Sequence, residues 1–173
     1  MKLYLFDVDN TLAQVHSVAL LPGVQEAVAT LPVDAAVALC TNQGGVGLRY
    51  WMESGGFGDP SRYETLEGVQ AKIFRIRDQL FERARVYISW RYQSRKGHWS
   101  TVPPGLENDP AWSKAWRKPN PGMLLQAMRD TGVAPADTLF VGDSEKRDQQ
   151  AAWAAGCGFM WADEFRRKGI GNA

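Results

Sequence analysis

The chain has 173 residues and a mass of 19.2 kDa, which fits one domain with its own core and excludes a large multidomain assembly. Hydrophobic residues make up 45% and charged residues 23%, which excludes a wholly disordered or fibrous chain. Twenty Lys and Arg against nineteen Asp and Glu leave a net charge of +1, so the chain has no general attraction to nucleic acid or to an anionic membrane.

Three further patterns indicate where the protein works. No run approaches the roughly 18 to 20 apolar residues of a membrane-spanning helix. The first apolar run, residues 3–6, ends at Asp7 and Asp9, which is not the pattern of a secretory signal. Cys40 and Cys157 are far apart, each in an apolar run, as buried reduced thiols are. We therefore expect a cytoplasmic protein without a membrane partner.

The predicted elements alternate along the chain between strands and helices. In order, they are a strand over 2–6, a helix over 22–31, a strand over 35–40, a helix over 65–84, a strand over 86–89, a helix over 121–131, a strand over 138–141, a helix over 146–155 and a strand over 159–162. Residues 44–62 and 91–117 have no periodicity and are predicted to be long loops.

Strands joined through helices predict a parallel sheet, because parallel neighbours need a crossover. The fold class is therefore α/β, with a doubly wound, Rossmann-like sheet. We expect a single domain over 1–173 with a long loop and helix insertion at about 44–117.

Polar clusters follow the apolar runs or open a helix, and in such a sheet the loops at the carboxyl ends of the strands share one crevice. The clusters are residues 7–11, 41–43, 117–119, and 142–143 with 148. Asp7 and Asp143, at neighbouring strand ends, predict a site for a hard cation such as Mg²⁺ that suits a phosphate group. Lys118 adds positive charge, and the hydroxyl of Thr41 can donate to a phosphate oxygen.

With a phosphate neutralised in this way, Asp7 is the candidate nucleophile, and its attack would form an aspartyl-phosphate. Asp9 lies two residues further on, so in extended backbone its side chain shares a side with that of Asp7. Two carboxylates on one side can divide nucleophilic and acid-base work.

The four clusters, in this order from Lys2 to about Ala162, resemble those of the haloacid-dehalogenase-like (HAD-like) superfamily of aspartate-nucleophile phosphotransferases. The resemblance implies that Asp9 protonates the leaving oxygen and then activates water, and that its backbone carbonyl joins Asp7 and Asp143 as a metal ligand. It also implies that Asp148, the second acid of the Gly-Asp motif, supports the metal end of the site.

Two longer runs, 41–46 and 117–123, are similar to one branch of that superfamily, subfamily III. The branch contains histidinol-phosphate phosphatases, heptose-bisphosphate phosphatases and the 3′-phosphatase domains of polynucleotide kinases, and its members typically lack a large cap domain. The resemblance implies that Asn42 and Lys118 bind phosphate and that Arg117 grips the substrate. Many members carry a Cys/His zinc loop, but His98 is the single Cys or His residue between Asn42 and Arg117.

Three functions remain open from the sequence. The leading one is a Mg²⁺-dependent phosphomonoester hydrolase acting on a small phosphorylated metabolite, of the sugar-phosphate or histidinol-phosphate kind. The second is a polynucleotide 3′-phosphatase, because residues 62–117 contain eleven Lys and Arg against six Asp and Glu, interleaved with tryptophan and tyrosine, which is typical of a single-strand platform. The third is a non-catalytic phosphate-binding or partner-binding module. The substrate and the oligomeric state are not determined by the sequence.

Overall fold

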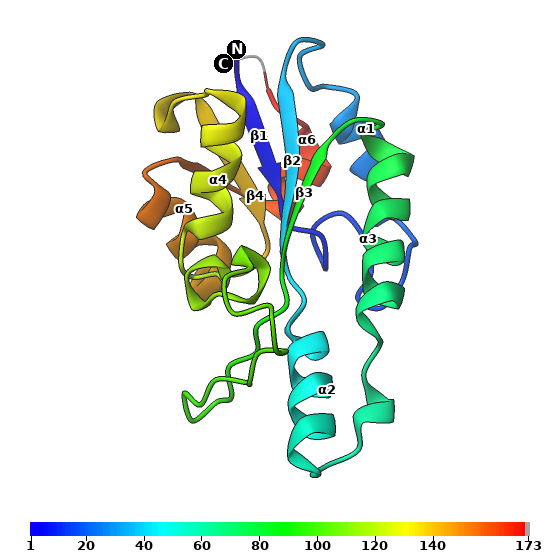
Figure 1. Cartoon of the computed structure of the whole chain (residues 1–173). Helices are drawn as coiled ribbons and strands as arrows, with labels where there is room; N and C mark the ends of the chain where they lie inside the picture. The colour runs from blue at the N-terminus through cyan, green and yellow to red at the C-terminus, as the bar shows by residue number, and fades with distance from the viewer. Residues whose placement is uncertain (172–173) are drawn as a thin grey trace.

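The fold is organised around a parallel sheet of five strands, seen in a computed structural model that describes residues 1–171 (Figure 1). The strand order is β3-β2-β1-β4-β5, and all neighbouring strands pair in parallel. The strands are β1 (Leu3–Phe6), β2 (Ala36–Asn42), β3 (Arg85–Ser89), β4 (Thr138–Gly142) and β5 (Gly158–Trp161). This topology confirms the predicted doubly wound α/β class.

Helices cover both faces of the sheet, and the alternation along β1 explains why (Figure 1). Tyr4 and Phe6 pack on one face, and Leu3 and Leu5 pack on the other, because successive strand side chains point to opposite sides. The first face is covered by α1 (Val24–Val28), α3 (Leu66–Leu80) and α6 (Ala162–Lys168), and the second by α4 (Gly122–Thr131) and α5 (Gln150–Ala155). β1 is therefore buried on both sides at the centre of the molecule.

The prediction of a loop over 44–62 is wrong, because helix α2 (Gly44–Gly55) occupies its first twelve residues. The glycines that resembled loop signals are instead required by close packing. A Cβ atom on Gly47 would lie 2.3 Å from the carbonyl oxygen of Trp90, and one on Gly44 would lie 2.7 Å from Nη1 of Arg117. At Gly47 the neighbour is backbone, so helix α2 can approach the chain after β3 only with a glycine there, and packing overrides weak helix propensity; at Gly44 the neighbour is the end of a flexible arginine side chain.

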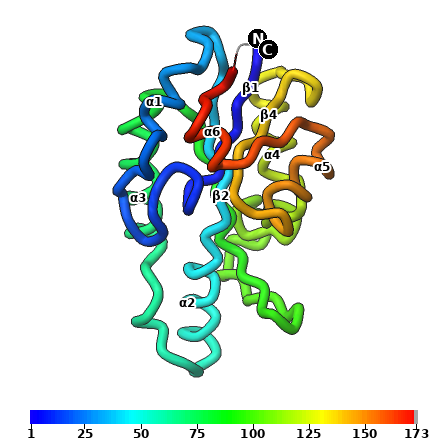
Figure 2. The backbone as a smooth tube through the Cα atoms, turned by 180° about the vertical axis from the view of Figure 1, so that it is seen from behind, coloured from blue at the N-terminus to red at the C-terminus, as the bar shows by residue number. Residues whose placement is uncertain are grey.

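Helix α2 and the segment 91–117 both extend past the carboxyl ends of the strands (Figures 1 and 2). As predicted, 91–117 has no long regular element, although short 3₁₀ turns occur at Pro110–Trp112 and Lys114–Trp116.

The sequence patterns did not indicate α6, a seven-residue helix directly after β5. Its Phe165 is fully buried, with its ring 5.1 Å from that of Phe6, and this contact anchors the helix to the sheet.

Two expectations about the chain can be compared with the structure directly. Cys40 and Cys157 are buried free thiols, as predicted. Among residues 1–171, each helix is too short or too polar to cross a membrane.

Replacing Gly47 with Ala should destabilise the protein by about 1–3 kcal/mol, because the added methyl group collides with the backbone of Trp90 and Tyr92. The matched change in the same helix is Gly45→Ala, whose methyl group would meet the Tyr63 ring at an ordinary 3.5 Å. Gly45→Ala should leave stability unchanged or raise it by up to about 1 kcal/mol through better helix propensity. Urea unfolding of both variants measures the difference, and equal stabilities would contradict the packing argument.

Candidate active site

Polar side chains from four separate segments meet at the carboxyl ends of β1, β2 and β4. Asp7 follows β1, and its backbone N–H donates to the carbonyl of Val141 at 2.9 Å, so the strand pairing places its carboxylate beside the end of β4. A cavity of about 170 Å³ lies at this edge. It is lined by Asp7, Asp9, Asn10, Val15, Asn42, Lys118, Asp143, Arg147 and Asp148.

A buried lysine lies between two buried carboxylates. Nζ of Lys118 is 2.8 Å from Oδ1 of Asp7 and 2.7 Å from Oδ1 of Asp148, and all three residues are at most 7% exposed. Burial alone would lower the pKa of Lys118, but the charges of Asp148 and Asp7 outweigh it and raise the pKa above its ordinary value. Lys118 is therefore a fixed positive charge in the wall of the cavity.

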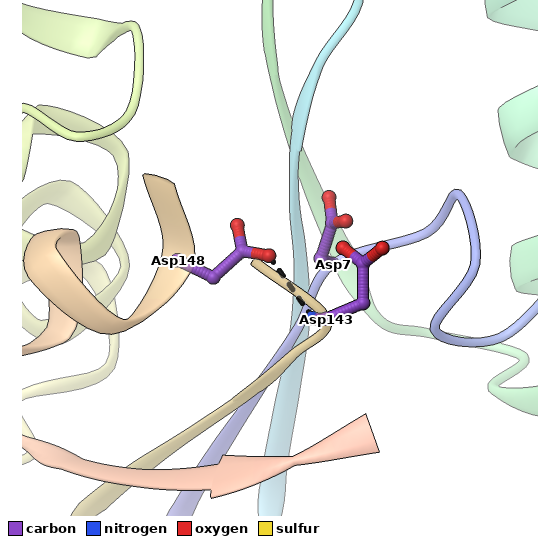
Figure 3. Close-up of side chains that lie close together, drawn as sticks. All are labelled: Asp7, Asp143 and Asp148. Atoms are coloured by element: carbon purple, nitrogen blue, oxygen red, sulfur yellow. Dashed lines mark hydrogen bonds between the residues drawn. The ribbon is translucent and has the colours of Figure 1, made fainter. Parts of the chain in front are cut away.

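Three carboxylates form a cluster suited to a cation. Oxygens of Asp7, Asp143 and Asp148 lie within 4.8 Å of one another, and Figure 3 shows the carboxylates of Asp7 and Asp143 extending in the same direction. Burial raises the pKa of Asp7 to about 7, against the lowering effect of Lys118. Burial, followed by the charge of Asp148, also raises the pKa of Asp143. Three acids facing one lysine leave excess negative charge, and this all-oxygen donor set fits Mg²⁺.

Asp148 is held in place by two kinds of contact. Its Oδ1 accepts from Lys118, and its Oδ2 accepts from the backbone N–H groups of Asp143 and Ser144 at 3.1 and 3.0 Å (Figure 3). Burial would raise the pKa of Asp148, but Lys118 and these hydrogen bonds lower it overall. With both oxygens occupied, Asp148 is placed to orient Lys118 and the loop that carries Asp143.

Asp9 is oriented by a residue to which the sequence analysis gave no role. Nε2 of Gln43 donates to Oδ2 of Asp9 at 2.8 Å and to the hydroxyl of Thr41 at 3.0 Å. The other oxygen of Asp9, Oδ1, is buried without a hydrogen-bond partner within residues 1–171. The sequence feature that could have identified Gln43 was its position directly after Thr41 and Asn42. Thr41 itself is buried beneath this contact and is not part of the cavity lining in the described structure.

Asn42 and Arg117, the remaining predicted substrate contacts, lie in different surroundings. Asn42 pairs with the backbone of Lys118 in both directions, with each hydrogen bond 3.0 Å long, so its amide group positions the lysine. The guanidinium of Arg117 lies against Gly44 and donates to the carbonyl of Arg91 at 2.9 Å, outside the described lining of the cavity. Arg147, which the sequence analysis did not single out, lines the cavity from the π-helical turn Glu145–Gln149.

The aromatic residues of the basic segment divide into two groups. Tyr87, Trp90 and Trp112 are at most 7% exposed and pack in the core. Trp99 instead makes cation–π contacts with two side chains. The Arg91 guanidinium is 5.9 Å and the Lys114 ammonium is 5.5 Å from the centre of its ring. Several aromatic side chains of residues 62–117 are therefore part of the core.

Comparisons with known proteins agree with this geometry. Residues 115–163, which include Lys118, Asp143 and Asp148, match the model of a HAD-hydrolase-like family. A segment of 41 residues, 24% of the chain, is 58% identical to part of the phosphoglycolate phosphatase of Thiobacillus denitrificans and spans 18% of that protein.

Solved structures resemble the chain over most of its length. The D,D-heptose 1,7-bisphosphate phosphatase from B. bronchiseptica is 30% identical, with a TM-score of 0.59 over 92% of this chain and 79% of that one. The corresponding enzyme from Burkholderia thailandensis is 22% identical, covers 96% of this chain and 94% of that one, and with a TM-score of 0.53 shares the fold. The chain therefore belongs to the HAD-like superfamily of hydrolases. Within that superfamily, the relatives described here are phosphatases.

Replacing Lys118, whose ammonium group is buried, tests the charge balance of the site. Lys118→Met should lower the free energy of unfolding by about 3–5 kcal/mol near neutral pH without divalent metal, because it leaves buried carboxylates unpaired. Urea unfolding measures the loss, and Lys96→Met, at an exposed position, is the matched control.

The deficit of Lys118→Met should shrink at lower pH. The pKa of Asp7, already raised by burial, rises further without Lys118, so the folded variant binds a proton that the unfolded chain releases. Both folded forms hold this proton at pH 5, but the parent releases it near pH 7 and the variant only at higher pH, so stability of the variant relative to the parent is lost as the pH rises from about 6 to about 8.5. A deficit that does not change over this range would contradict the charge argument.

Proposed function

We propose that the protein is a Mg²⁺-dependent phosphomonoester hydrolase in which Asp7 is the nucleophile. The observation that carries the proposal is the buried arrangement in which Asp7 shares Lys118 with Asp148 and lies within 4.8 Å of Asp143. The B. bronchiseptica phosphatase structure, 30% identical to this chain, is complexed with magnesium and phosphate, which supports the same ligands here.

The residues divide the reaction between two carboxylates. Oδ1 of Asp7 binds Lys118, which leaves Oδ2 as the oxygen that attacks phosphorus. As the Asp7 oxygen–phosphorus bond forms, the bond from phosphorus to the leaving oxygen breaks, and Asp9 gives its proton to that oxygen. Asp9 then takes a proton from a water molecule, whose oxygen attacks the aspartyl-phosphate and releases phosphate and free Asp7. Lys118 stabilises the negative charge of the phosphoryl oxygens throughout.

The metal would be held by the carboxylates of Asp7 and Asp143 and by the backbone carbonyl of Asp9, with Asp148 supporting them. When bound, Mg²⁺ neutralises charge on the phosphate and lets the Asp7 carboxylate approach it. Thr41, Asn42 and Arg117 stay predicted phosphate and substrate contacts, although Thr41 and Arg117 lie outside the described lining of the first cavity. Asn42 acts mainly through Lys118, given its two hydrogen bonds to that backbone.

A small phosphorylated metabolite is the favoured substrate class. The similarity to heptose-bisphosphate phosphatase supports a sugar-phosphate type, and the burial of Tyr87, Trp90 and Trp112 weighs against an extended platform for nucleic acid. We also infer that the protein works in the cytoplasm and that the chain forms one HAD-like domain. The reduced state of the buried cysteines is consistent with that location. Within the predicted insertion, 44–117, α3 and β3 belong to the sheet and its cover, so the inserted parts are the segments before and after them.

Asp7→Asn should lower phosphate release by at least about 1,000-fold, because an amide cannot form the aspartyl-phosphate. Release of phosphate with Mg²⁺ is measured on a panel of sugar phosphates, amino-alcohol phosphates, nucleotides and 3′-phosphorylated oligonucleotides. Asp163→Asn, at an exposed position on α6, is the matched control and should retain full activity. Undiminished turnover by Asp7→Asn would refute the mechanism.

Asp9→Asn should lower turnover by about 100- to 10,000-fold, because a general acid and base is lost. The loss should be smaller for phosphoesters with good leaving groups, which need less protonation. A rate profile against leaving-group pKa measures this difference, and a uniform loss across the series would argue against proton transfer by Asp9.

Removal of divalent metal with EDTA should abolish turnover, and Mg²⁺ should restore it.

Adding salt distinguishes the substrate classes. Activity on an oligonucleotide end should fall steeply with salt as counterions compete, whereas activity on a small metabolite should fall little. Binding of Mg²⁺ and phosphate without any turnover would instead identify a non-catalytic module.

A further inference from the structure

A second and larger cavity opens next to the one described above. Its volume is about 410 Å³, which is in the range of small-molecule sites. It is lined by Asp9, His16, Asn42, Gln43, Gly44, Gly45, Val46, Arg62, Tyr63, Glu64 and Val69. Because Asp9 and Asn42 line both cavities, the two are adjacent.

The position of Asp9 fixes how a phosphoester would span the two cavities. Asp7, Lys118 and Asp143 line the first cavity alone, so the phosphoryl group belongs there. Asp9 lies at the junction, and its Oδ1 is a buried acceptor without a partner among the described residues. Asp9 is the acid of the proposed reaction, so the leaving oxygen would lie beside its carboxylate at this junction, which places the rest of the leaving group in the second cavity, hereafter the leaving-group compartment.

The walls of the leaving-group compartment come from three segments that are anchored to one another. The amino end of α2 supplies Gly45, where a Cβ atom would lie 3.5 Å from the Tyr63 ring. Nη1 of Arg49 donates to the backbone carbonyls of Tyr63 and Pro60, at 2.6 and 3.3 Å, and so fastens the Tyr63 segment to α2.

The third wall is the loop after β1, which lies beside the amino end of α3 in both views (Figures 1 and 2). Nδ1 of His16 in this loop is 3.3 Å from Oε1 of Glu64, across 48 residues of sequence. This contact joins two walls of the compartment, so a long polymer would meet the His16 and Glu64 side chains there.

The charged side chains that line the compartment are the carboxylates of Asp9 and Glu64 and the guanidinium of Arg62. Nζ of Lys72, behind the lining, is 3.4 Å from Oε1 of Glu64, and Nε of Arg62 is 3.4 Å from Oδ2 of Asp59. Two carboxylates against one paired guanidinium disfavour an anionic leaving group. The second oxygen of Glu64, Oε2, has no hydrogen-bond partner in residues 1–171 and can accept from hydroxyl groups.

We propose that this compartment binds an uncharged, hydroxylated leaving group of monosaccharide or polyol type, and that Tyr63 and Glu64 determine this specificity. The Tyr63 ring offers an apolar face to the C–H groups of such a molecule, and Oε2 of Glu64 accepts its hydroxyl protons. The proposal rests on the proposed phosphatase function, because it assigns the half of the substrate that the first cavity does not bind.

The test compares the kcat/KM of Glu64→Gln and Tyr63→Ala with the parent on glucose 6-phosphate, glycerol 1-phosphate and acetyl phosphate. Each variant should lose about tenfold or more on the two hydroxylated substrates, because contacts to the leaving group are removed. Acetyl phosphate, whose leaving group is small and lacks hydroxyl groups, should change by less than about twofold, as should the Ki of inorganic phosphate. Glu67→Gln on the first turn of α3, outside the compartment, is the matched control and should behave as the parent.

Three outcomes separate the proposal from the function on which it rests. No turnover of any substrate by the parent protein would overturn the phosphatase function itself. Turnover of acetyl phosphate with a preference for fructose 1,6-bisphosphate or a nucleotide over the hydroxylated monophosphates would overturn the leaving-group assignment alone. An equal loss on all substrates, with an unchanged thermal unfolding midpoint, would also overturn it, because the two residues would then not discriminate between leaving groups.

Discussion

The ammonium group of Lys118, buried between Asp7 and Asp148, is the interaction on which the rest of the site depends. It joins residues 111 positions apart, and removing the lysine would leave two uncompensated carboxylates in the protein interior. Asn42 adds a fourth segment by bonding to the backbone of the lysine on both sides. The group therefore fixes the ends of β1, β2 and β4 relative to the segment before α4.

The charge balance of this group also explains its chemistry. One lysine cannot neutralise the surrounding carboxylates, which is why burial and mutual repulsion raise the pKa values of Asp7 and Asp143. A divalent cation would supply the missing positive charge, and with that cation in place the site would accept an anionic phosphate group. The same excess of acids that disfavours the empty site thus favours a site for metal and phosphate.

The sequence predicted the sheet well and the segment between β2 and α3 less well. Buried parallel strands are continuous apolar runs, and their polar ends must meet at one edge, so Asp7, Asp9 and Asp143 were found by position alone. Helix α2 was missed because Gly44 and Gly47 resemble loop residues. Their actual cause, contact with Arg117 and Trp90, is visible only once the chain is folded.

The sequence by itself determined the fold class, the order of the motifs and the identity of the groups that can do chemistry, because these depend on periodicity and on residue type. The tertiary structure decided how those groups are used. It showed that Gln43 orients Asp9, that Asn42 supports Lys118, and that Arg117 turns toward the backbone of Arg91. Such contacts join segments far apart in the chain, and their geometry depends on how α2 and the loops pack, which local sequence patterns do not encode.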